Sequence, residues 1–396
     1  MSVHVESDEI DARVREPVDD LKQGEPARMK HTPMYQRHLE LGATMYTTGT
    51  GYALASRYSS ADEEARAVRQ RVGIIDLSLM TRLSIKGKDA LRLTQKLIVN
   101  DAEKLKDGQA LYSTMCNEQG LIVDDVVVFR FNAEHFWVIT SSAYRRGTFA
   151  WISSHMQGVD ASLTDVSSAY AMMGVQGPKS RELLSSISDI DFSKLGFFRF
   201  AEGHIGGAPC IVARLGFSGE LGYEVYVNTE DGIDTWDKIM ETGKAVGLIP
   251  YGMDALDLLR LEKGFVFFGY DATERDNPYE CRLWPFIKLD RGDFIGREAL
   301  LKIRDAGPKK QLMGLKVAGN TVLTAGSPLH MNGGAAGTVV IGFRSPNLNE
   351  NLAYAYVNAP SVQVGAVVSV EVAGEQVQAT VVEMPFLDPE GTRLRG

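Results

Sequence analysis

The chain has 396 residues, of which 44% are hydrophobic and 23% charged, a balance typical of globular proteins. This length predicts two or three domains with a substantial core. The net charge of -9 argues against a nucleic-acid or anionic-membrane surface, and no apolar run approaches the roughly 18 residues of a transmembrane helix.

The first 30 residues are rich in acids and lack the apolar segment of a secretory signal. We therefore expect residues 1–30 to form a charged, poorly ordered extension or an interaction arm. The three cysteines, Cys116, Cys210 and Cys281, have no close pairing or metal-binding spacing, which favours reduced thiols in a cytoplasmic protein.

The first half of the chain mixes predicted helices and strands. Ser60 and Glu63 form a capping-box pattern that begins a helix, which Gly73 is expected to end. Apolar, β-branched runs predict a β-hairpin over 123–142. The other expected elements are a strand over 80–87 and helices over 88–98 and within 176–187.

In the second half, the pattern predicts a strand over 219–228 and helices over 229–247, 253–264 and 294–307. From about residue 310, short strands broken by glycines predict a small β-barrel or sandwich, with a hairpin turn at Asn332. Strands and helices do not alternate as regular βαβ units, so the α+β class is favoured over a Rossmann sheet.

Asp124 and Asp125 are adjacent acids inside a β-branched run. Because strand side chains alternate between two faces, both cannot reach solvent if one face packs on a core. A buried lone carboxylate is costly unless it is paired or hydrogen-bonded. A hydrated strand end is the simpler alternative.

Familiar catalytic motifs are absent from the sequence. There is no phosphate-binding loop and no H-E-x-x-H motif, and Ser218 lacks the G-x-S-x-G frame of a nucleophile elbow. No histidine has the spacing of a metal ligand, so we expect no metal site. His38 and His135 are expected to be surface or capping residues rather than catalytic ones.

Several segments, taken in order, resemble the aminomethyltransferase superfamily, which includes the glycine-cleavage T-protein and folate-dependent demethylases. The set spans residues 32 to 386, and no single motif is decisive. The segments are TPMYQRHLELGA, GIIDLSLM, LYSTMCNEQGLIVDD, QGP, GFSGELGYEVY, LLRLEKG, NPYEC, DFIGREAL and MPF.

The resemblance implies a three-lobed α+β fold around a central channel that holds tetrahydrofolate. The first α/β lobe would comprise residues 31–83 and 169–285, and the second residues 84–168. Residues 286–396 would form a linker helix and the C-terminal β-barrel.

The resemblance also assigns site residues. Asp125 would lie at the reacting end of the pterin as a general base and electrostatic group, leaving Asp124 as an outward or capping partner. Glu224 would pair with the amino-pyrimidine edge, unless it is an exposed strand residue. The expected folate contacts, which could equally be plain core residues, are Met80, Tyr112 and Ile139.

Departures from the T-protein pattern bear on the substrate. Leu79 replaces a histidine, and Leu256 replaces an arginine whose loss removes an anion-binding fork. Residues 46–58 and 340–342 and the C-terminus also differ. The substrate pocket is expected to use Tyr46, Tyr58 and Trp284, which lie in divergent segments.

These departures favour a tetrahydrofolate-dependent demethylase that moves a methyl or methylene group from a small methylated substrate to tetrahydrofolate. One alternative is a T-protein that receives aminomethyl carbon from a lipoyl carrier protein. The other is a folate-binding maintenance protein without turnover, although retention of Asp125 argues against pure binding.

Overall fold

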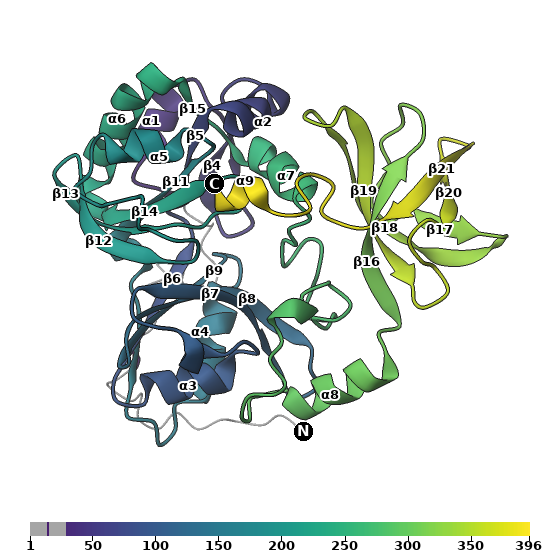
Figure 1. Cartoon of the computed structure of the whole chain (residues 1–396), viewed down its shortest axis with the longest axis horizontal. Coiled ribbons are helices and arrows are strands. Elements are labelled where there is room, and N and C mark those ends of the chain that lie inside the picture. The colour runs from purple at the N-terminus through teal and green to yellow at the C-terminus, as the bar shows by residue number, and fades with distance from the viewer. Residues whose placement is uncertain (1–13, 16–28) are drawn as a thin grey trace.

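The computed structural model describes residues 14–15 and 29–396, so the predicted extension over 1–30 lies almost entirely outside the described residues. Within the described residues, the strands form two six-stranded sheets, a three-stranded sheet and a closed six-stranded barrel. Figure 1 shows the two large sheets stacked at the left and the barrel at the right. The expected α+β class with a C-terminal barrel is confirmed.

The first large sheet, called sheet I, has the strand order β1-β10-β6-β9-β8-β7. Helices α3 (Ala90–Leu97) and α4 (Arg145–Ser154) pack on one face through a buried apolar cluster. The strands are β1 (Val14–Arg15), β6 (Thr81–Lys86), β7 (Gln109–Cys116), β8 (Ile122–Asn132), β9 (His135–Thr140) and β10 (Ser162–Asp165).

The second large sheet, called sheet II, has the strand order β12-β13-β14-β11-β5-β15. Helices α5 (Ser180–Ser185) and α6 (Gly232–Gly243) pack on its outer face, where Trp236 and Ile239 are buried. The strands are β5 (Val72–Asp76), β11 (Tyr170–Gln176), β12 (Phe200–Ile205), β13 (Ala208–Ala213), β14 (Gly222–Asn228) and β15 (Leu248–Pro250).

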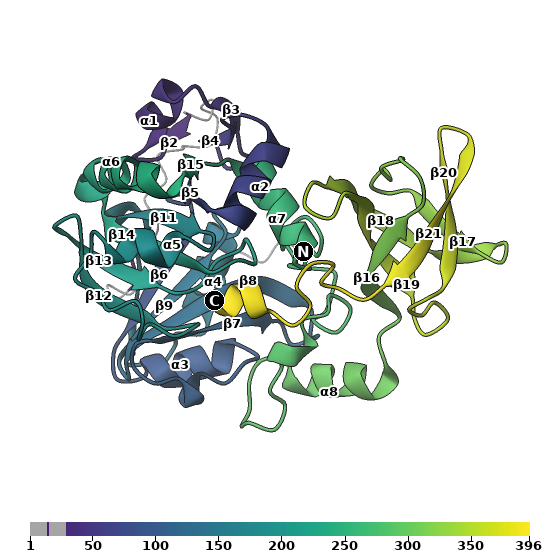
Figure 2. The same cartoon turned by 45° about the horizontal axis from the view of Figure 1, so that its top comes forward.

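The inner faces of sheets I and II pack against each other. Phe129, Trp137 and Ile139 from sheet I share one buried cluster with Met172 and Tyr226 from sheet II. The order of layers is therefore helix, sheet, sheet, helix, which Figure 2 shows from a second direction. The four central strands β8, β9, β11 and β14 each contribute apolar residues to this cluster and to a helix-covered cluster, and the space between the sheets is the natural place for a buried site.

Residues 30–70 lie against sheet II. Helix α1 (Tyr35–Glu40) is followed by a hairpin of β3 (Thr44–Thr47) and β4 (Tyr52–Arg57), and β4 also pairs with β2 (Lys30–His31). Helix α2 (Ala61–Gln70) packs beside α7 (Met253–Glu262).

The expected start of α2 is confirmed, because the Ser60 side chain accepts a hydrogen bond from the backbone N–H of Glu63. Its expected end at Gly73 is wrong. The helix ends at Gln70, and Gly73 lies within β5. A Cβ atom at Gly73 would meet Val68 and Tyr251 at 2.6 Å, so this glycine serves close packing.

The barrel follows helix α8 (Arg297–Ala306), and Asn332 and Gly333 both have positive φ at its predicted hairpin turn. Over residues 29–396, no helix is both long and apolar enough to cross a membrane. The barrel strands are β16 (Lys310–Val317), β17 (Pro328–Met331), β18 (Gly334–Ser345), β19 (Glu350–Asn358), β20 (Val367–Val372) and β21 (Glu375–Val382).

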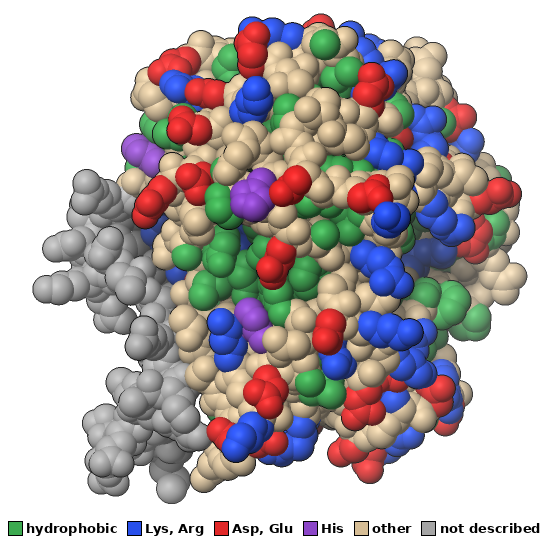
Figure 3. Space-filling view, turned by 60° about the vertical axis from the view of Figure 1, so that its left-hand side comes forward, with side chains coloured by type: hydrophobic (Ala, Val, Ile, Leu, Met, Phe, Trp, Pro, Cys, Tyr) green, Lys and Arg blue, Asp and Glu red, His purple; other side chains and the backbone are tan. Residues whose placement is uncertain are grey.

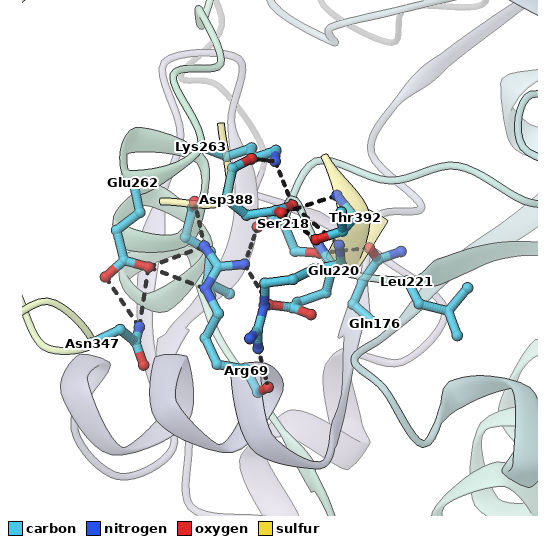
Figure 4. Close-up of polar contacts among 12 residues, drawn as sticks. Arg69, Gln176, Ser218, Glu220, Leu221, Glu262, Lys263, Asn347, Asp388 and Thr392 are labelled. Carbon is cyan, nitrogen blue, oxygen red and sulfur yellow. Dashed lines mark hydrogen bonds and ion pairs between the residues drawn. The ribbon is translucent and has the colours of Figure 1, made fainter. Parts of the chain in front are cut away.

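A buried ion cluster joins the barrel to sheet II. Arg69 on α2 pairs with Glu262 at 3.0 Å and with Glu220 at 3.1 Å, and all three side chains are nearly inaccessible to solvent. Asn347, in the loop after β18, donates to Glu262, as Figure 4 shows. After β21 the chain returns to this cluster, where Arg393 of α9 (Thr392–Arg395) contacts Glu220 at 2.7 Å.

The outer surface carries charges of both signs. Figure 3 shows the left-hand side of the molecule, with a hydrophobic patch near its centre and acidic and basic side chains interspersed around it. The three cysteines are free and buried.

Candidate functional site between the two sheets

One row of side chains crosses sheet I on the face that meets sheet II. Arg82 on β6 lies opposite Ile139 on β9, Ile139 lies opposite Val127 on β8, and Val127 lies opposite Tyr112 on β7. Directly opposite residues in antiparallel strands project to the same side. Two residues expected to contact folate, Ile139 and Tyr112, therefore share one row.

Asp125 lies on the same face of β8, two residues before Val127. The hydroxyl of Tyr112 donates a hydrogen bond to Asp125 Oδ2 at 2.9 Å. The Tyr112 ring packs edge-on against Phe286 with ring centroids 4.8 Å apart. Burial raises the pKa of Asp125, and the hydrogen bond from Tyr112 opposes that rise. The structure thus brings the expected catalytic carboxylate beside an expected folate contact.

The expectation that Asp124 points outward is wrong. Its side chain is fully buried on the helix-covered face of sheet I. The hydroxyls of Thr140 and Thr148 donate to Asp124 Oδ2, and the backbone N–H of Asp125 donates to Oδ1 at 2.9 Å. Burial and the neighbouring charge of Asp125 raise the pKa of Asp124. Helices cover this face of β8 and bury Asp124 completely, whereas Asp125 on the other face is only partly buried.

Glu224 projects from the facing surface of sheet II. Its side chain is nearly inaccessible, so the alternative of an exposed strand residue is wrong. Tyr226 donates a hydrogen bond to Glu224 Oε2 at 2.6 Å, whereas Oε1 has no hydrogen-bond partner among the described residues. Burial raises the pKa of Glu224 to about 7, against the opposing effects of the Tyr226 hydrogen bond and the Arg82 charge.

Met80 and Ile139 both pack in the apolar cluster between the sheets. Met80 closes the turn after β5, where its N–H donates to the carbonyl of Leu77 at 3.0 Å. Ile139 is almost completely buried. The two side chains therefore also fill the plain core role that the sequence left open.

The three expected substrate residues do not lie together. Tyr46 on β3 is 39% exposed, and Trp284 is 53% exposed at the start of the short 3-10 helix η5 (Trp284–Phe286). Phe286 in that helix contacts Tyr112, so Trp284 lies near the Asp125 end of the row. Tyr58 points elsewhere, with its hydroxyl 2.8 Å from His38 Nδ1.

The expectation that His38 is a surface or capping residue is wrong. His38 is 1% exposed, and its Nε2 lies 3.0 Å from Asp76 Oδ2. Burial opposes ionisation of Asp76, yet its hydrogen bonds to His38 and Ser78 hold its pKa below the usual range. His38 on α1 and Asp76 on β5 therefore form a buried pair between this helix and sheet II.

A separate open depression of about 510 Å³ lies at β12 and the loop before it. Its lining includes Asp107, Asp189, Arg199 and Glu202 and none of the residues predicted from the sequence.

Sequence reasoning missed Arg82, which the structure places in the same row as Ile139 and Tyr112. The signal in the sequence was an arginine inside a segment predicted to be a strand, between Thr81 and Leu83. The structure shows that both of these neighbours are fully buried. Without knowledge that β6 is covered on both faces, alternation alone assigns such a residue to solvent.

Comparison with known proteins agrees with this architecture. Residues 34–291 match the GCVT N-terminal domain, and residues 310–388 match the glycine cleavage T-protein C-terminal barrel domain. The crystal structure of glycine cleavage system aminomethyltransferase T from Bartonella henselae has the same fold, with a TM-score of 0.85 at 24% identity, covering 91% of this chain and 99% of that one.

Full-length relatives are more similar in sequence. The aminomethyltransferase of Halothermothrix orenii is 34% identical over 359 residues, covering 91% of this chain and 100% of the relative. That of Herpetosiphon aurantiacus is 37% identical over 359 residues, covering 90% and 98%. The chain therefore belongs to the glycine cleavage T-protein family, within the aminomethyltransferase superfamily that its motifs resemble.

Proposed function

We propose that this protein is a tetrahydrofolate-dependent aminomethyltransferase that transfers a one-carbon unit from an amine donor to tetrahydrofolate. The observation that carries the proposal is the pairing of Asp125 with Tyr112 on one sheet and the half-satisfied Glu224 carboxylate on the facing sheet. Near-full-length relatives that are called aminomethyltransferases support it.

The residues between the sheets fit tetrahydrofolate. Glu224 is nearly inaccessible, and its Oε1 has no hydrogen-bond partner among the described residues, which suits the N–H donors of an amino-pyrimidine. Met80, Ile139 and Tyr112 supply apolar and aromatic surface for a flat ring. When bound, tetrahydrofolate would supply the nitrogen that accepts the carbon.

Asp125 would handle the proton and charge changes at the reacting end. Its Oδ2 is fixed by the Tyr112 hydroxyl, whereas Oδ1 accepts no side-chain hydrogen bond among the described residues and can take a proton from a cationic amine. The partial burial of Asp125 limits access of water and strengthens this interaction. Most of the remaining rate enhancement would come from holding the reactants in alignment.

A demethylase acting on a small methylated substrate is the second candidate. It is favoured by Leu256, which is buried in one apolar cluster with Ile75 and Tyr251 where the T-protein pattern has arginine. This apolar position cannot bind an anion as an arginine fork does. The two candidates share folate and Asp125 and differ in the donor, which is a lipoyl carrier protein for a T-protein.

The donor can be identified by mass spectrometry of the folate product. The protein is incubated with tetrahydrofolate and either the other three glycine-cleavage proteins with glycine, or a panel of methylated amines and sulfonium compounds. Product formed with the carrier supports the T-protein reading, and product formed only with a small donor supports the demethylase. Folate binding without any product would leave a maintenance protein, and absence of folate binding would overturn the whole proposal.

The Asp125→Asn variant tests the catalytic assignment. Folate affinity should stay within a few-fold of wild type, while turnover should fall by about 10²-fold or more, the scale of a positioned acid–base group. Glu182→Gln serves as a control, because its side chain is 59% exposed on α5. Unchanged turnover in Asp125→Asn would remove Asp125 from the mechanism.

A further inference from the structure

Arg82 is a fully buried cation on the inner face of sheet I. Its Nη2 donates to the carbonyl oxygens of Ser78 at 3.2 Å and Tyr170 at 2.9 Å, and also to that of Ser167. No carboxylate among the described residues forms an ion pair with it, and its Nε has no hydrogen-bond partner. Asp165 acts on Arg82 electrostatically but is itself paired with Arg145. Burying a charge without an ion pair of its own is costly, so this arrangement calls for a physical reason.

The guanidinium reaches across to sheet II. Nη1 of Arg82 lies 3.8 Å from the sulfur of Met172 on β11. Met172 lies directly opposite Tyr226 on β14, and the Tyr226 hydroxyl donates to Glu224 at 2.6 Å. Arg82 on sheet I therefore contacts Met172, whose strand neighbour Tyr226 shares the same buried cluster and is hydrogen-bonded to Glu224.

The charge of Arg82 acts on Glu224 through this buried region. Burial favours the protonated form of Glu224, whereas Arg82 and the Tyr226 hydroxyl favour the ionised form. Tyr251 is the other titratable side chain that interacts electrostatically with Glu224, and it is also buried. Arg82 is thus the cation that acts on this carboxylate in the described part of the chain.

We propose that Arg82 is a positioning residue whose buried positive charge holds the Glu224 carboxylate in the negative form that recognises the amino-pyrimidine edge of a folate. The inference rests on the proposed function, because it assumes that Glu224 meets the pterin. It assigns Arg82 a role in cofactor affinity that is exerted through Glu224 and does not require contact with the ligand.

The test is the pH dependence of tetrahydrofolate binding, measured by isothermal titration calorimetry between pH 6 and 9 under anaerobic conditions. Wild-type affinity should rise as the pH increases through about 7, where Glu224 ionises. Arg82→Gln keeps N–H donors for the carbonyl oxygens but removes the charge. Its inflection should move up by about one pH unit, with roughly fivefold weaker binding at pH 7 and recovery near pH 9.

Two further variants isolate the mechanism. Arg82→Lys keeps the charge and should keep the wild-type inflection even if its affinity is lower. Glu224→Gln should lose the inflection, and adding Arg82→Gln to it should change affinity by less than about threefold, since the two act as one unit. If Arg82→Gln does not fold, Arg82→Lys decides, and a shifted inflection despite the retained charge would contradict the inference.

The outcomes distinguish an error in the proposed folate site from an error in the role of Arg82. If Glu224→Gln leaves folate affinity unchanged, the proposed folate site itself is wrong. If Glu224→Gln weakens binding but Arg82→Gln lowers affinity equally at every pH, or not at all, only the role of Arg82 is wrong.

Discussion

At the scale of single residues, two neighbouring carboxyl groups on β8 occupy opposite environments. Asp125 faces sheet II and shares a hydrogen bond with Tyr112, whereas Asp124 faces the helical layer and is held by Thr140 and Thr148. Two interacting buried acids titrate as a pair, and the first proton leaves more easily than the second. One acid can therefore remain protonated while the other stays available for chemistry.

The raised pKa of Asp124 has a consequence for stability. The unfolded chain releases this proton near the ordinary carboxyl range of about pH 4, whereas the folded protein retains it to higher pH. The folded state thus binds more protons over this interval, and stability decreases as the pH rises. Asp124→Asn removes that proton, so its melting temperature should fall less than that of wild type between pH 5 and 8.

Differential scanning fluorimetry across this pH range measures the effect. Asp62→Asn is the control, because Asp62 is 53% exposed on α2 and its curve should run parallel to wild type. If the melting temperature of Asp124→Asn fell with pH as steeply as that of the wild type, Asp124 would already be ionised in the folded protein.

At the scale of elements, the structure separates what local sequence specifies from what tertiary contacts decide. The Ser60 cap, the β8–β9 hairpin and the Asn332 turn are encoded by nearby residues and were predicted correctly. The β3–β4 hairpin was not predicted, because its strands are short and partly exposed and have no strong alternation.

The site shows the same division. The orientation of Asp124, the burial of His38 and the position of Arg82 depend on which faces are covered by layers that come from distant parts of the chain. Residue spacing within a strand shows which side chains share a face, but it does not show whether the second face is exposed to solvent. The family resemblance selected Asp125 and Glu224, and the sheet registers supply the facing surfaces on which they lie.

The same scale gives a prediction for helix α2. Arg69 is 3% exposed and neutralises Glu220 and Glu262, so Arg69→Met leaves Glu262 without its cation and Glu220 with Arg393 alone. Breaking a buried pair in this way costs about 3–5 kcal/mol. Arg66 lies one turn earlier on α2 and is 50% exposed, so Arg66→Met should change stability by no more than about 0.5 kcal/mol.

Urea unfolding followed by circular dichroism compares the two variants. Equal losses of stability for Arg69→Met and Arg66→Met would mean that the buried cluster contributes no more than an exposed pair.

At the scale of the whole molecule, the last residues connect the barrel to the body of the protein. The backbone N–H of Leu387 donates to the carbonyl of Glu262 at 3.0 Å, and Asp388 pairs with Lys263 at 2.8 Å. Arg393 then reaches Glu220 and the carbonyl of Arg69. The C-terminal segment thus links α2 and α7 to the barrel through hydrogen bonds and ion pairs.

Arg393→Met should loosen this connection without unfolding the barrel. Loss of its hydrogen bonds to the Glu220 carboxylate and the Arg69 carbonyl costs on the order of 1 kcal/mol, which corresponds to several-fold faster local opening. Hydrogen exchange should increase in α2 and around Glu220. Arg395→Met is the control, since its side chain forms no hydrogen bond or ion pair among the described residues. Faster exchange confined to the barrel strands would place the connection elsewhere.

The shared face of sheets I and II has an evolutionary consequence. The side chains that would hold the cofactor, such as Ile139 and Met80, also form the cohesive core between the two sheets. A substitution there alters binding and folding at once, so these positions have little freedom to diverge. The exposed aromatic side chains do not serve both binding and folding in this way. They include Tyr46, Tyr270 and Trp284, each at least 39% exposed. New donor preferences within this architecture should therefore arise by drift at these surface aromatics, while the interior stays fixed.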